Sequence, residues 1–191
     1  MIISTVSLII TSNYMKKILA LVLAAAFGMT MAFNASAIED PDPVGAITVG
    51  AHAAFYPGGG GNVFADYVLF DNWWKGHFTV GAEAAFNAFS RQSGYGISVS
   101  DTRLCLVPRA TYGLNILPNL EVHAGALLGL GYEQTRVSDG HSSSVDGGHI
   151  RLVIGDILGA RYFLTDNLGI SAEMNYASYM PYLNIGVALR F

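Results

Sequence analysis

The sequence predicts an all-β chain that folds as an eight-stranded antiparallel up-and-down transmembrane β-barrel. Apolar residues recur at every second position in segment after segment, and successive side chains on a strand point to opposite faces. Only 13% of the residues are charged and the mean hydropathy is +0.40, whereas soluble proteins carry about 25% charged residues. After Met31 the sequence contains no apolar run of the roughly 18 residues that a membrane-spanning helix needs. Apolar residues spread at alternate positions are typical of a membrane barrel.

Residues 1–37 have the pattern of a leader with a signal peptide. Met15 is followed by two lysines, then by an apolar run rich in Ala and Leu, and Ala35-Ser36-Ala37 has the small-x-small pattern of a cleavage site. We therefore expect translation to start at Met15 and cleavage to follow Ala37. Residues 38–43, which are acidic and contain two prolines, are expected to be a periplasmic lead-in, and residues 44–191 are expected to be the barrel.

The first four predicted strands are residues 44–56, 62–74, 77–89 and 100–115. Pro57 and four glycines separate the first from the second, which is the least regular and is expected to turn Asp66 and Phe70 inward. Polar residues 91–98 are expected to form a loop. Pro108 interrupts the fourth strand and lacks a backbone donor, which predicts a bulge or a locally broken ladder.

The last four predicted strands are residues 120–136, 149–164, 168–179 and 183–191. Residues 138–148, rich in Ser, Asp and Gly, are expected to be the longest loop. Strict alternation would direct Asp156 toward lipid, where a charge costs a few kcal/mol at mid-bilayer, so a bulge is expected near Gly155. The last strand alternates perfectly and ends in an aromatic residue, Phe191.

The polar face of these strands decides whether the barrel is soluble or membrane-embedded, because a soluble barrel has the same period with its apolar face inward. Here the face opposite the apolar one mixes Gly and Ala with charged residues, which suits a narrow lumen. We expect a lumen charge cluster of Glu83, Arg103, Arg109, Glu121, Arg151, Arg161, Glu173 and Arg190.

Aromatic residues near the strand ends provide a second criterion. Two belts of aromatic side chains are what the two membrane–water interfaces favour. The predicted interface aromatics are Trp73, Trp74, Tyr112, Tyr132, Tyr162 and Tyr176, together with Phe191.

By these features, and by the stretches 167–173 and 183–191, the chain resembles the small eight-stranded outer-membrane barrels of the OmpA/OmpX type. The resemblance implies a location in the outer membrane of a Gram-negative bacterium with the N-terminus in the periplasm. It also implies contact with outer-membrane lipid and lipopolysaccharide, a monomeric state, and recognition of Phe191 as a signal by the barrel-insertion machinery.

Three functions are compatible with such a barrel. The first is a structural or surface-interaction role with a lumen plugged by charges and no enzymatic activity. The second is a narrow porin-like channel for small solutes. The third is an outer-membrane lipid hydrolase, for which only His141-Ser142-Ser143 offers a nucleophile beside a base.

No cofactor or metal site is expected, because the five histidines form no dense ligand motif and Cys105 is the only cysteine. His52 and His123 are expected to be polar filler in the lumen. A net charge of −4 argues against nucleic acid as a partner.

Overall fold

The computed structural model describes residues 42–56, 58–93, 97–138, 143–145 and 147–191. The expected leader, the start of the lead-in and the pair His141-Ser142 lie outside the described residues. Within them, no helix is long and apolar enough to cross a membrane.

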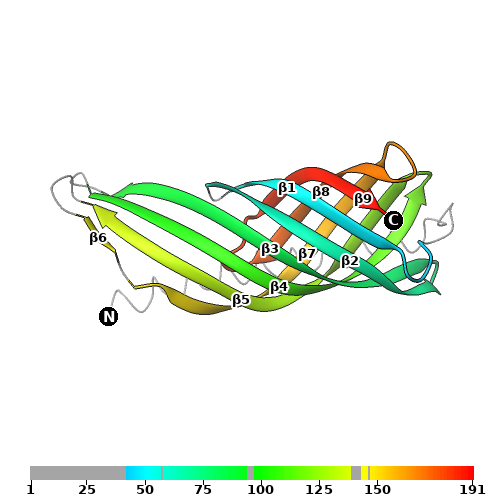
Figure 1. Cartoon of the computed structure of the whole chain (residues 1–191), viewed down its shortest axis with the longest axis horizontal. Helices are drawn as coiled ribbons and strands as arrows, with labels where there is room; N and C mark the ends of the chain where they lie inside the picture. The colour runs from blue at the N-terminus through cyan, green and yellow to red at the C-terminus, as the bar shows by residue number, and fades with distance from the viewer. Residues whose placement is uncertain (1–41, 57, 94–96, 139–142, 146) are drawn as a thin grey trace, which may run out of the picture. The chain divides into compact units, whose positions relative to one another are not determined.

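Eight antiparallel strands form a closed ring, as expected (Figure 1). Neighbours in the ring are β1, β2, β3, β4, β5, β7, β8 and β9, and β9 pairs with β1 to close it. A ninth, short strand, β6, extends one edge of β5. The bounds are β1 Ile47–Phe55, β2 Gly59–Trp73, β3 Gly76–Ser93, β4 Ile97–Leu117, β5 Leu120–Ser138, β6 Ser143–Val145, β7 His149–Phe163, β8 Leu168–Ala177 and β9 Leu183–Arg190.

The two ends of the barrel differ. At one, here called the turn end, short turns join β2 to β3, β4 to β5 and β7 to β8. At the other, here called the extended end, β3, β4, β5 and β7 continue beyond the remaining strands (Figure 1). β2 pairs with β3 only as far as Ala88, and β8 pairs with β7 only as far as Gly155. The upper parts of β3, β4, β5 and β7 therefore project as a sheet, with β6 at its edge.

Several strands are longer than the sequence suggested. β2 begins at Gly59, inside the expected glycine turn, because Tyr56 and Gly58 adopt positive φ and reverse the chain within three residues. The expected loop 91–98 is mostly strand, since Arg91 pairs with Val99 and Ser93 with Ile97. The expected loop 138–148 contains β6. Hydrogen-bonded pairing of long antiparallel neighbours thus extends strands through polar sequence.

One predicted irregularity is wrong, and a second is confirmed in one of its two expected forms. β5 and β7 pair without any register shift from Leu120 to Glu133, so no bulge forms near Gly155 and Asp156 lies exposed on the outer face between Ala126 and Tyr176. At Pro108 the ladder is locally broken, as predicted, because neither Pro108 nor Val107 has a β5 partner, and the register does not shift.

A bulge does occur in β2, where the pairing with β3 shifts between Val68 and Phe70. The shift turns Phe70 to the outer face, where it is 56% exposed, whereas the sequence had placed it inside. Phe64, Asp66 and Val68, which precede the shift, are buried as predicted.

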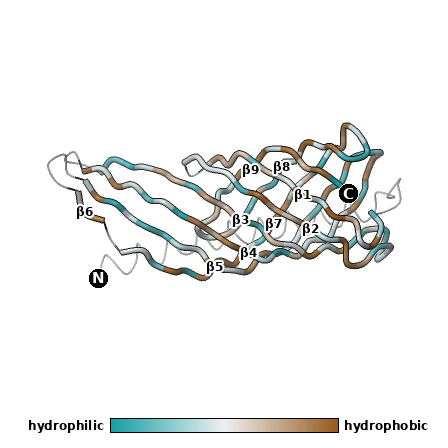
Figure 2. The backbone as a smooth tube through the Cα atoms, viewed as in Figure 1, coloured by the Kyte–Doolittle hydropathy of each residue, from teal (hydrophilic) through white to brown (hydrophobic). Residues whose placement is uncertain are grey.

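The outer face of the ring is apolar and the inner face is polar, as Figure 2 illustrates by the alternation of hydropathy along each strand. Large apolar side chains such as Val63, Leu106, Leu128, Ile154 and Ile185 are about half exposed or more. Asp66, Glu83, Arg109, Arg161 and Glu173 are buried. This inversion of the soluble pattern is what a lipid solvent requires.

Candidate functional site in the barrel lumen

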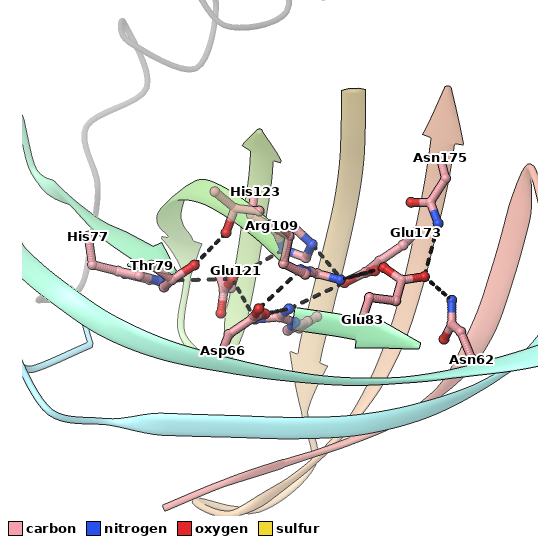
Figure 3. Close-up of polar contacts among 12 residues, drawn as sticks. Asn62, Asp66, His77, Thr79, Glu83, Arg109, Glu121, His123, Glu173 and Asn175 are labelled. Atoms are coloured by element: carbon pink, nitrogen blue, oxygen red, sulfur yellow. Dashed lines mark hydrogen bonds and ion pairs between the residues drawn. The ribbon is translucent and has the colours of Figure 1, made fainter. Parts of the chain in front are cut away.

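Arg109 on β4 is the centre of a buried charge cluster (Figure 3). Its Nη1 donates to Glu83 Oε2 and its Nη2 to Glu173 Oε1, at 3.0 and 2.9 Å. Its Nε lies 3.0 Å from Asp66 Oδ1. One guanidinium therefore joins carboxylates from β2, β3 and β8, and all three are at most 3% exposed.

Arg161 on β7 is the second cation of the cluster. Its Nη2 donates to Asp66 and, at 3.2 Å, to Glu173, and its Nη1 lies 3.4 Å from Glu121 Oε1. The ring of Phe64 contacts both arginines, with each guanidinium carbon 4.8 Å from its centroid. Asp66 and Glu173 thus each contact both arginines, and the aromatic face lies beside two like charges.

His123 on β5 connects the cluster to the turn end. Its Nε2 lies 3.0 Å from Glu173 Oε1, and its Nδ1 lies 3.2 Å from Glu121 Oε1. On the opposite side of Glu121, His77 Nε2 lies 3.9 Å from the same oxygen. Asn62 and Asn175 donate to Glu83 Oε1 at 2.6 and 3.2 Å. We call Asp66, Glu83, Arg109, Glu121, His123, Arg161 and Glu173 the lumen cluster.

Glycine on the inner face gives the lumen cluster its space. A Cβ on Gly81 would lie 2.4 Å from Asp66 Oδ1, and one on Gly159 would lie 2.4 Å from His123 Nε2. An eight-stranded barrel is only wide enough to be filled by its own side chains. The glycines therefore allow long charged side chains to cross a space that larger neighbours would occupy.

An apolar layer covers the lumen cluster toward the extended end. Cys105, Val107, Leu127, Val153 and Ile157 form a buried core from β4, β5 and β7. Met180, in the connection from β8 to β9, packs into this core and is 3% exposed. The β8–β9 connection thus reaches into the barrel and separates the charges from the extended end.

A second, smaller polar group lies beyond this layer, on the projecting sheet. Arg103 on β4 pairs with Glu133 on β5 at 2.8 Å. The Arg103 guanidinium also lies over the rings of Phe89 and Tyr179, at 4.6 and 5.1 Å from their centroids. Both members of the pair are half-buried, so this ion pair meets solvent while those of the lumen cluster do not.

The structure brings five of the eight predicted lumen charges into contact and separates three. Glu83, Arg109, Glu121, Arg161 and Glu173 form the lumen cluster, as described above. Arg103 lies on the projecting sheet. Arg190 lies at the turn end, where its Nη1 donates to Asp42 Oδ1 at 2.8 Å. Arg151 is exposed, and it lies on the part of β7 beyond Gly155, the last residue that pairs with β8.

Sequence reasoning left Asp66, His77, His123 and Asp42 out of the predicted charge cluster. Alternation alone places Asp66 and His123 on the inner face, so that signal was available. His77 is the first residue of the predicted strand 77–89, so alternation also places it on the inner face, whereas Asp42 precedes the first strand and has no register from which to infer a direction. Only the folded barrel brings these residues together.

The predicted interface aromatics lie on the outer face near the strand ends. Trp73, Trp74, Tyr132, Tyr162 and Phe191 are exposed, with Trp74 at 72% and Phe191 at 70%. Tyr112 and Tyr176 are half-buried, and each makes a polar contact. The Tyr112 hydroxyl donates to the carbonyl oxygens of Trp73 and Trp74. The Tyr176 hydroxyl forms a 2.8 Å hydrogen bond with the hydroxyl of Tyr182. The role of Phe191 as an insertion signal stays a prediction.

Comparison with known proteins supports the fold and gives no closer relationship. No protein-family model matches the sequence, and no curated protein matches it. Among solved structures, Ail, the attachment invasion locus protein of Yersinia pestis, is 15% identical, with 78% of this chain and all of that chain covered at a TM-score of 0.54. A major outer membrane protein from Thermus thermophilus is 15% identical over the same shares, at a TM-score of 0.57. This chain therefore has the fold of the small eight-stranded outer-membrane β-barrels.

Proposed function

We propose that this protein is a non-conducting, non-enzymatic barrel of the outer membrane that acts at the cell surface through its projecting sheet. The apolar outer face supports the membrane location, because such a surface is stable in lipid and aggregates in water. In this arrangement the N-terminus lies in the periplasm, the turn end faces the periplasm, and the extended end faces the outside. The chain acts as a monomer in contact with outer-membrane lipid and lipopolysaccharide.

The burial of the lumen cluster is the observation that carries the proposal of a closed lumen. Each of its charged side chains is at most 3% exposed, so protein atoms rather than an open channel surround them. The ion pairs cross the lumen from β2 to β7 and from β4 to β8, and the layer around Met180 covers them. An ion could pass only by displacing paired charges, and breaking a buried pair costs about 3–5 kcal/mol.

The projecting sheet supports a role in interaction rather than transport. Its inner face is polar and partly charged: Arg91 lies 3.9 Å from Asp101, and Thr135 donates to Asp101 at 2.6 Å. Arg103 and Glu133 continue this row toward the barrel. A rigid sheet that presents side chains beyond the membrane has the form of a contact surface, whereas conduction requires no such extension.

Single-channel recording in planar lipid bilayers tests the closed lumen. We expect no steady current from the wild-type barrel, with heat-modifiable mobility on gels as the control that folded protein is present. Arg109→Ala with Met180→Ala removes both the central cation and the covering side chain, and we expect it to conduct intermittently. A steady wild-type current would favour the narrow-channel alternative instead.

The absence of enzymatic activity is tested separately, since the lipid hydrolase alternative depends on residues 141–143. Purified protein is incubated with lipopolysaccharide, and released fatty acid is measured for the wild type, Ser142→Ala and Ser143→Ala. We expect no release from any of the three. Release by the wild type that is lost in either variant would establish a hydrolase and overturn this part of the proposal.

A further inference from the structure

The turn end of the lumen brings together three side chains that are far apart in the sequence. Asp42 precedes β1, His77 is the second residue of β3, and Glu121 is the second residue of β5. One possible ligand atom from each lies within 4.8 Å of those from the other two. All three residues are buried, at 5%, 1% and 2% exposure. We call them the mouth triad.

Two polar atoms of the mouth triad are unsatisfied. Among the residues that the structure describes, His77 Nδ1 and Glu121 Oε2 are buried and have no hydrogen-bond partner. Buried polar atoms in folded proteins nearly always have a partner, and exceptions require an explanation. Imidazole nitrogens and carboxylate oxygens are the atom types that bind Zn²⁺, and one of each is left without a hydrogen-bond partner in this buried group.

The charge of the surrounding lumen points the same way. The carboxylates of the lumen cluster and Asp42 number five, whereas the guanidinium groups that pair with them number three. The carboxylates are Asp42, Asp66, Glu83, Glu121 and Glu173, and the cations are Arg109, Arg161 and Arg190. The acidic side chains therefore outnumber the guanidinium groups around the mouth triad, which favours a bound cation. Uncompensated buried charge is strongly unfavourable.

We propose that Asp42, His77 and Glu121 form a binding site for a divalent transition-metal ion, represented by Zn²⁺. One imidazole and two carboxylates suit Zn²⁺, which accepts N and O ligands at about 2.0–2.2 Å. Ca²⁺ and Mg²⁺ prefer sites made of oxygen atoms alone. The lack of any ligand motif in the sequence had led us to expect no metal, and the proposal departs from that expectation.

Neighbouring side chains already orient two of the three ligands, Asp42 and Glu121. Arg190 Nη1 lies 2.8 Å from Asp42 Oδ1, and Asn115 Nδ2 lies 3.5 Å from the same atom. His123 and Arg161 contact Glu121 Oε1, which leaves Oε2 unpaired. Hydrogen bonds of this kind to ligating carboxylates are usual in metal sites.

His77 is positioned by the absence of a side chain at Gly113. A Cβ there would lie 2.5 Å from His77 Nε2. The metal ion would join the segment before β1 to β3 and β5, and so hold that segment in the mouth of the barrel.

Cobalt substitution tests the site directly. The folded, untagged chain in detergent micelles is washed with chelator and titrated with Co²⁺, whose visible absorption reports its ligands. We expect one Co²⁺ per chain, displaced by Zn²⁺ and not by Ca²⁺. Asp42→Asn and His77→Gln should abolish the absorption, and the exposed His149→Gln should leave it unchanged.

Folding is checked for each variant by heat-modifiable mobility on gels. If His77→Gln does not fold, Asp42→Asn decides the question, because residue 42 lies outside the strands. The proposal is wrong if the folded wild type gives no cobalt spectrum. It is equally wrong if the spectrum persists in folded Asp42→Asn, which would indicate an adventitious ion only.

Discussion

Arg109 shows how much a single buried side chain contributes to the barrel. It contacts Asp66, Glu83 and Glu173 from three other strands, and all four side chains are almost completely buried. A buried charge that loses its partner retains the full cost of desolvation. Loss of the Arg109 guanidinium would therefore leave Glu83 without a guanidinium partner, whereas Asp66 and Glu173 would keep Arg161.

We expect Arg109→Ala to lower the free energy of unfolding by about 3–5 kcal/mol, the range measured when one partner of a buried pair is removed. The measurement is urea unfolding of the folded barrel in lipid vesicles, followed by tryptophan fluorescence. Arg136→Ala, at an exposed position on β5, is the matched control and should change stability by no more than about 0.5 kcal/mol. Equal effects of the two substitutions would show that the pairing is not stabilising.

Asp156 is the opposite case, a carboxylate on the face that meets lipid. It lies between Ala126 and Tyr176 on neighbouring strands, with Ile154 and Leu158 exposed on either side along β7. A lipid-facing charge in a barrel is destabilising, and less so for acidic than for basic side chains. We expect Asp156→Leu to raise the free energy of unfolding by about 1–2 kcal/mol in the same assay. Asp166→Leu, in the β7–β8 turn, is the control; stabilisation by both would point to a general effect of hydrophobicity.

Alternation in the sequence was sufficient to place most inner and outer residues, including Glu83, Arg109 and Glu173. Alternation gave the wrong environment where a bulge shifted the strand register or where a strand continued beyond its neighbour. Phe70 follows a bulge in β2 that no sequence feature predicts. Arg151 follows the expected alternation, but it lies beyond the end of β8. At Asp156 alternation was correct. The energetic cost of a lipid-facing charge had led to the expectation of a bulge, and the structure has none there.

At the scale of elements, the inequality of the strands is the main feature. β4 has 21 residues whereas β1 has 9, so one side of the ring extends far beyond the other. The sequence did not reveal this, since residues 91–98 are polar and alternate weakly. Their strand structure comes from pairing with neighbours, and cross-strand contacts rather than local propensity determine it.

The projecting sheet predicts which cysteine replacements can be labelled from outside the cell. Cys105 is buried, so the wild type should not react with a membrane-impermeant maleimide. Gln92→Cys, exposed near the end of β3, should be labelled in intact cells. Asp166→Cys, exposed at the turn end, should be labelled only after the outer membrane is permeabilised. The reverse pattern would mean that the turn end faces outward.

The β8–β9 connection is the second element with a distinct role, because it delivers Met180 to the apolar layer over the lumen cluster. Met180→Ala should cost about 2–5 kcal/mol, as large-to-small changes in buried cores do, in the urea assay described for Arg109. Leu164→Ala, exposed at the turn end, removes a similar volume without a cavity and is the control. A loss no greater than that of the control would place Met180 outside the packed core.

At the scale of the whole molecule, closure of the ring makes the barrel one cooperative unit. β1 pairs with β9 over eight residue pairs, and the backbone groups of Ile47 and Phe191 hydrogen-bond to each other in both directions at the seam. A membrane interior offers no water to satisfy an open strand edge, so closure is obligatory. Because these two strands are the first and last of the ring, the contact that completes the fold is also the one most distant in sequence.

The seam predicts a specific disulfide. Ala53 and Ile185 are direct partners across β1 and β9, and Cβ atoms of such pairs lie about 4.5–5.5 Å apart, close enough for a disulfide after small adjustment. In a Cys105→Ala background, Ala53→Cys with Ile185→Cys should oxidise in the folded barrel to form a covalent loop that spans the whole ring. After boiling without reductant, this loop should migrate differently from the reduced chain on a gel. Ala53→Cys with Leu189→Cys, displaced by four residues along β9, should form no disulfide; efficient crosslinking of that pair instead would show a different register and a different shear of the barrel.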